Sequence, residues 1–81
     1  SKRVYFAPNL DFYLLDEKVG IIVSPFLSID LCFMKIKKHL KDYLELDLNE
    51  IIIISNNTSL TQNLNGIKIS ILPFWRFVTS F

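Results

Sequence analysis

Two short apolar runs separated by an amphipathic segment most constrain how this chain can fold. Residues 19–23 read Val-Gly-Ile-Ile-Val, and residues 51–54 are consecutive isoleucines. β-Branched runs that do not alternate with polar residues are typical of strands buried on both faces. Residues 29–45 between them are long enough for the crossover helix that a parallel pair of strands requires. The sequence therefore predicts a β-α-β unit with residues 51–54 at the centre of a sheet.

The apolar residues within 29–45 recur at alternating spacings of four and three, the period of an amphipathic helix. The predicted apolar stripe consists of Ile29, Phe33, Ile36, Leu40 and either Tyr43 or Leu44. Ser28 or Asp30 can cap the start of this helix by accepting a hydrogen bond from a free N–H. The lysines outside the stripe are Lys35, Lys37, Lys38 and Lys41. We expect them to form a solvated face, since cations near a helix C-terminus complement its dipole.

The segments on either side of this unit predict further strands. Residues 2–7 and 11–15 flank the turn signal Pro8-Asn9 and predict an N-terminal hairpin. Residues 67–71 alternate apolar and polar and predict a strand near an edge, whereas residues 60–64 are read as one or two helical turns closed by Asn65-Gly66. The predicted fold is α/β: a small, mostly parallel sheet built on the β-α-β unit and preceded by a β-hairpin. The alternative is an α+β, β-grasp-like arrangement with a mixed sheet.

Length and composition predict one small domain that has more apolar residues than its own core can bury. A chain of 81 residues buries only about 60% of the surface that its unfolded form exposes. Because 51% of the residues are hydrophobic, part of this apolar surface is expected to be covered by a partner. Residues 1–81 are therefore read as a single domain, either self-associating or a fragment of a larger protein.

The C-terminal segment carries the clearest candidates for such an interface. The aromatic residues there are Phe74, Trp75, Phe77 and Phe81. Trp and Phe are typical anchors of protein interfaces. Ordinary core packing of these side chains against the sheet is the alternative, and the sequence leaves it open.

Charge and cysteine content narrow the class of protein. Nine Lys or Arg against eight Asp or Glu give a formal charge of +1, so net charge does not indicate a nucleic-acid partner, although local binding is left open. Cys32 is the single cysteine and cannot form an internal disulfide, and no signal peptide is recognised, so a cytoplasmic location is expected. No uninterrupted run reaches the ~18 apolar residues of a membrane span.

Polar residues follow both predicted central strands. Ser24, Ser28 and Asp30 come after the first, and the loop after the second contains Ser55, Asn56, Asn57 and Thr58. Ligands of parallel sheets bind outside the carboxyl ends of the strands, where helix N-termini and loops converge. These seven residues are therefore candidates for binding an anionic or phosphorylated ligand. The alternative is that they only cap a helix and form a turn.

The sequence offers no convincing catalytic or metal-binding group. His39 is the only histidine and is expected at the helix surface, without Cys, Asp or Glu at metal-ligand spacing. Cys32 is read as a small core residue. Gly20 and Gly66 are the only glycines, and neither lies at a strand-to-helix turn where a phosphate-binding loop would need one. We predict no catalytic residue, no metal and no cofactor.

Three segments together resemble the first part of a phospholipase D superfamily half-domain. They are the strand followed by Ser-Pro-Phe-Leu-Ser at residues 24–28, then residues 50–56, then residues 64–72. The family's catalytic signature is His-x-Lys followed after four residues by Asp. Residues 73–81 contain no histidine, and after His39-Leu40-Lys41 the position that needs Asp is Leu46. The resemblance thus implies an inactive or truncated half-domain, with a phosphodiester as the class of ligand.

Two functions follow from these patterns. The leading hypothesis is a non-enzymatic α/β module that acts through self-association or by docking in a larger protein, so that its partners are proteins. The alternative is a domain that binds a phosphorylated or phosphodiester ligand at the carboxyl ends of the strands.

Overall fold

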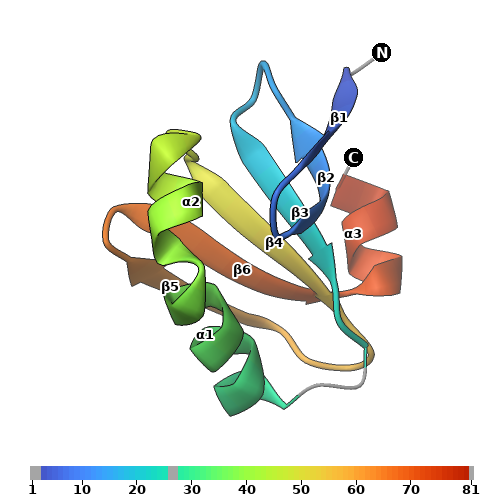
Figure 1. The fold of residues 1–81 in the computed structure, drawn as a ribbon. Coiled ribbons are helices and arrows are strands. Elements are labelled where there is room, and N and C mark those ends of the chain that lie inside the picture. Colours follow the sequence, from blue (N-terminus) through green and yellow to red (C-terminus); the bar gives the residue numbers. More distant parts are fainter. Residues whose placement is uncertain (1–2, 26–27, 81) are drawn as a thin grey trace.

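The fold is taken from a computed structural model, which describes residues 3–25 and 28–80. The elements in chain order are β1 (Val4–Ala7), β2 (Leu10–Leu14), β3 (Val19–Val23), α1 (Ile29–Lys38), α2 (Leu40–Glu45), β4 (Glu50–Ser55), β5 (Leu60–Leu64), β6 (Ile67–Pro73) and α3 (Phe74–Ser80). They form an α/β domain around one mixed sheet (Figure 1).

The strands lie in the order β1-β2-β3-β4-β6-β5. β3, β4 and β6 are parallel neighbours, whereas the β1–β2, β2–β3 and β5–β6 pairs are antiparallel. The prediction of a mostly parallel sheet is therefore wrong, because hairpin-type connections extend the parallel centre on both sides. The N-terminal hairpin is confirmed, and the mixed character of the sheet matches that feature of the alternative fold.

The β-α-β unit forms as predicted. β3 pairs with β4 in parallel, with Ile21 opposite Ile52, and β4 lies between β3 and β6. The crossover is helical, but it divides at His39 into α1 and α2. The N–H of His39 still bonds to the carbonyl of Ile36 at 3.1 Å, so the two helices follow one another directly.

Residues 60–64 are a strand, and the prediction of helical turns there is wrong. Asn65 and Gly66 both have positive φ, at 52° and 86°, and they form the two-residue loop between β5 and β6. Positive φ at both central positions is the type I′ geometry that matches the twist of a β-hairpin, and Asn-Gly is its preferred sequence. The same dipeptide can also close a helix, which is why the sequence pattern predicts helical turns here.

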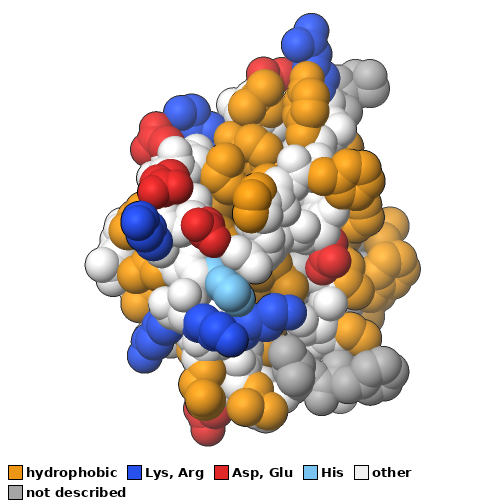
Figure 2. Space-filling model, in the orientation of Figure 1, with side chains coloured by type: hydrophobic (Ala, Val, Ile, Leu, Met, Phe, Trp, Pro, Cys, Tyr) orange, Lys and Arg blue, Asp and Glu red, His pale blue; other side chains and the backbone are white. Residues whose placement is uncertain are grey.

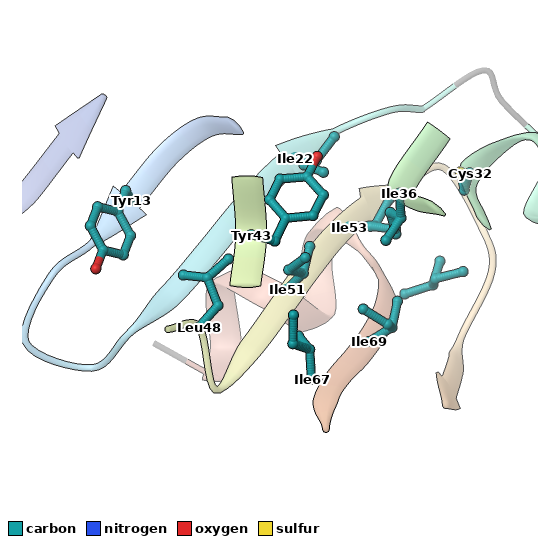
Figure 3. Packing of buried hydrophobic residues seen from close by; sticks show 11 residues of the cluster. Tyr13, Ile22, Cys32, Ile36, Tyr43, Leu48, Ile51, Ile53, Ile67 and Ile69 are labelled. Atoms are coloured by element: carbon teal, nitrogen blue, oxygen red, sulfur yellow. The ribbon is translucent and has the colours of Figure 1, made fainter. Parts of the chain in front are cut away.

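Side chains of β4 alternate between two cores on opposite faces of the sheet. Ile51 and Ile53 belong to the first core together with Ile36 and Tyr43 of the helices, as Figure 3 shows. Cys32 is buried in this core as expected. The second core is smaller and contains Leu14, Val19, Ile21, Ile52 and Ile54, with Leu72 and Phe77 packed against it. The helix pair therefore covers one face, and on the other Phe77 of α3 packs against the second core.

Tyr43 of α2 forms a hydrogen bond with the turn of the N-terminal hairpin. The hydroxyl of this completely buried tyrosine donates to the carbonyl of Asn9 at 2.8 Å. The side-chain amide of Asn9 donates to the carboxylate of Asp42 at 2.6 Å. Asn9 has a φ of 64°, a conformation that Asn tolerates better than most residues. Near the same end of β2, the carboxylate of Asp11 accepts from the N–H of Val23 at 2.7 Å.

We expect Tyr43 to make stability fall at high pH. Burial, with the nearby carboxylates of Asp42 and Asp11, raises the pKa of Tyr43 from 10.0 to about 12. Because the folded state holds this proton more tightly than the unfolded chain, the contribution to stability is complete below pH 10 and is lost as pH rises through about 12. The free energy of unfolding should fall by roughly 1.4 kcal/mol per pH unit in this window.

Urea unfolding at a series of pH values measures this effect. Tyr43→Phe should remove most of the pH dependence and lower stability near neutral pH by about 1 kcal/mol, because it breaks the bond to Asn9. Tyr5→Phe, at an exposed position, is the matched control. Equal pH profiles for the wild type and Tyr43→Phe would contradict the assignment.

Candidate functional site

Two of the predicted ligand residues lie together at the carboxyl ends of β3 and β4. Ser24 follows β3 directly, and its N–H donates to the carbonyl of Ile54 at 3.0 Å. Ser55 is the last residue of β4. Both serines are buried. The two predicted polar clusters, after β3 and after β4, therefore lie next to each other at Ser24 and Ser55.

The hydroxyl of Ser55 is already engaged within its own loop. It donates to the carbonyl of Thr58 at 2.8 Å and accepts from the N–H of Thr58 at 3.1 Å. Asn56 and Asn57, between them, are exposed. This pattern is a serine turn that closes the loop after β4, a role that needs no ligand.

Ser28 and Asp30 lie at the start of α1. The Ser28 hydroxyl accepts from the N–H of Leu31 at 3.3 Å and is the N-cap, and Asp30 is exposed in the first turn. A carboxylate in the first turn complements the positive end of the helix dipole. Both residues thus have structural roles, and the negative charge of Asp30 opposes binding of an anion at this terminus.

A polar hollow of about 340 Å³ lies on the sheet face that α3 shares. It is lined by Glu50, Ile52, Thr61, Lys68, Ser70, Leu72 and Arg76. The Ser70 hydroxyl donates to the carboxylate of Glu50 at 2.6 Å, and Lys68 lies 3.9 Å from the same carboxylate. Arg76 donates to the hydroxyl of Ser59 at 2.6 Å. The alternation of residues 67–71 predicts that Lys68 and Ser70 share one polar face of the strand. The sequence pattern does not indicate that Glu50 and Arg76 line the same hollow.

Exposed apolar side chains gather on the same side of the sheet, over the hairpin and α3. Phe12 pairs with Ile21 of the second core, and Val4 pairs with Leu14 of that core, so both point to this side. The Phe6 and Phe12 rings lie 6.4 Å apart. We call the following set the apolar face: Val4, Phe6, Phe12, Val23, Phe74, Trp75 and Val78, all exposed.

The predicted interface residues divide between two environments. Phe74 and Trp75 are 62% and 66% exposed, whereas Phe77 is half-buried and packs against the second core. Phe81 lies outside the described residues. Phe6, which is 86% exposed, was missed because the sequence reasoning assigned the hairpin only a structural role.

The helix-covered face carries the lysines that were expected to be solvated. Lys35, Lys37 and Lys38 are exposed in the last turn of α1, and blue side chains gather there in Figure 2. His39 forms the C-cap of α1 and is half-buried. Within residues 3–25 and 28–80, no three His, Cys, Asp or Glu side chains are placed to hold a metal ion.

Comparison with protein-family models, with curated proteins and with solved structures found no match. The resemblance to the phospholipase D superfamily therefore stays a prediction. None of the helices in the described part of the chain is long and apolar enough to cross a membrane.

Ser55→Ala tests whether this serine is structural. Removal of the hydroxyl leaves the partly buried N–H and C=O of Thr58 without their partner, so we expect a loss of about 1–3 kcal/mol in the free energy of unfolding. Asn56→Ala, at the adjacent exposed position, should change stability by less than about 0.5 kcal/mol. Urea denaturation measures both, and equal effects would contradict the role given to Ser55.

Proposed function

We propose that this chain is a non-enzymatic α/β module that acts by protein association, through self-association or by docking in a larger protein. The apolar face is the surface that carries the proposal. Its exposed aromatic residues come from opposite ends of the chain: Phe6 and Phe12 from the hairpin, and Phe74 and Trp75 from α3. Monomeric proteins rarely expose large contiguous apolar patches, and such patches commonly mark interaction sites.

The energetics of burial favour this face as an interface. Full burial of one large apolar side chain contributes about 1.5–3 kcal/mol, and Trp and Phe supply rigid contact area at a low cost in side-chain entropy. α3 has seven residues and places Phe77 against the second core. Phe74, Trp75 and Val78 are left outward, so the helix presents one apolar side to the sheet and another to a partner.

Self-association through this face can be followed with Trp75, the only tryptophan. We expect its fluorescence emission to move to shorter wavelength as protein concentration rises, because a second molecule removes water from the indole. Phe74→Ser should shift this transition to at least roughly tenfold higher concentration, through the loss of about 1.5–3 kcal/mol of apolar burial. Met34→Ser, at a 66% exposed apolar position on α1, is the control and should leave the transition unchanged.

Docking in a larger protein is tested separately, by a photo-crosslinking phenylalanine at position 75 or 34 in cells. A discrete adduct from position 75 and none from position 34 is the expected result. Emission of Trp75 that is independent of concentration, together with equal labelling from both positions, would overturn the proposed function.

Binding of an anionic ligand at the strand ends is the second candidate, supported by the juxtaposition of Ser24 and Ser55. It predicts that inorganic phosphate shifts the amide resonances of Ser24, Asn56 and Thr58 in solution NMR. We expect no such shifts, because the Ser55 hydroxyl and the Thr58 N–H are already bonded to each other and Asp30 repels anions at the α1 terminus. Saturable shifts confined to these residues would favour the ligand-binding function instead.

A further inference from the structure

The two edges of the sheet differ in how they are protected against pairing with another strand. β1 has a register shift between Tyr5 and Ala7, and Pro8 follows it directly. Bulges, prolines and flanking charge are the devices by which proteins block edge strands. β5 has none of them: its register with β6 runs without interruption from Leu60 to Leu64, and it contains no proline and no charged residue.

The outer side of β5 is open in the described part of the chain. Among the elements, β5 lies against β6 alone, and four of its five residues are exposed. A hairpin turn bonds its first residue to its fourth, so the Asn65-Gly66 turn directs the backbone groups of Leu64 toward Ile67. Antiparallel residues alternate in direction, so Gln62 and Leu60 also face β6. The N–H and C=O groups of Thr61 and Asn63 therefore point away from the sheet.

The sequence of β5 fits a second copy of itself. It reads Leu-Thr-Gln-Asn-Leu, so an antiparallel copy centred on Gln62 places Leu60 opposite Leu64 and Thr61 opposite Asn63. Two-fold symmetry brings Gln62 opposite its own copy, where a charged residue would repel itself. The outward groups of Thr61 and Asn63 then bond to one another across the axis.

We infer that two copies of this chain pair through the outer edges of β5, antiparallel and with the two-fold axis at Gln62, so that one sheet runs through both. This inference rests on the proposed association and names a second copy as partner, at an edge distinct from the apolar face. Leu64 packs against the first core, and Leu60 is 37% exposed. Opposite each other across the axis, these leucines extend that core into the neighbouring molecule.

Size-exclusion chromatography with light scattering tests the pairing. The wild type should have the mass of two chains or more, and Thr61→Pro should raise the dissociation constant by at least roughly tenfold, because it removes an outward N–H on each copy. Proline is tolerated on an edge strand where its nitrogen faces solvent, so the circular dichroism spectrum should be unchanged. Tyr5→Pro, on the opposite edge, should leave the β5 contact intact.

A charge exchange at Gln62 keeps the test decisive if Thr61→Pro does not fold. Gln62→Lys and Gln62→Glu should each weaken pairing, since like charges then meet at the axis. A mixture of the two should form a one-to-one heterodimer.

Several results would overturn the inference. One is a wild type that has the mass of one chain at every concentration. Another is a mixture that does not restore pairing. If the Gln62 variants associate as the wild type does while Phe74→Ser weakens association, pairing at β5 is wrong and the apolar-face function stands.

Discussion

The isoleucine strand β4 is buried on both faces, and this double burial dictates where the helices and the other strands must lie. Ile51 and Ile53 need a cover on one side, and Ile52 and Ile54 need one on the other. The α1–α2 crossover supplies the first cover, with Ile36 and Tyr43 almost completely buried. Among the described elements, the short helix α3 is the one that packs on the second face. This unequal cover explains why exposed apolar side chains of the hairpin and α3 lie on the second face.

The N-terminal hairpin extends the sheet beyond β3 and adds exposed apolar side chains to the less covered face. Tyr43 and Asp42 hold the Asn9 turn to α2, so β1 and β2 keep a fixed position. On the face of the second core, the hairpin exposes the neighbouring rings of Phe12 and Phe6. The attachment to α2 on one face therefore leaves aromatic rings exposed on the other, an arrangement that favours the association proposed above by lowering the entropic cost of ordering them.

For the predicted ligand and interface residues, residue type indicated the position in the fold but not whether the side chain is available for binding. The sequence predicts that Ser24 and Ser55 lie together at the carboxyl ends of β3 and β4, and they do, because parallel neighbours end on the same side of a sheet. Whether their polar groups are available depends on the loop, and there Ser55 bonds to Thr58. The predicted interface residues also lie in different environments: Phe74 and Trp75 are exposed, whereas Phe77 is half-buried and packs against the second core. Aromatic type alone does not distinguish these positions, since only helix phase relative to the sheet decides which side is buried.

The β-α-β centre, the hairpin and the central place of residues 51–54 were predictable from residue patterns, because apolar periodicity and segment length reflect burial directly. The mixed character of the sheet and the strand at residues 60–64 depend instead on contacts between distant segments. Asn65-Gly66 has positive φ in a helix cap and in a type I′ turn alike. Pairing along the open side of β6 selects the strand, through contacts that no local pattern contains. That pairing also makes β5 the unprotected edge of the sheet.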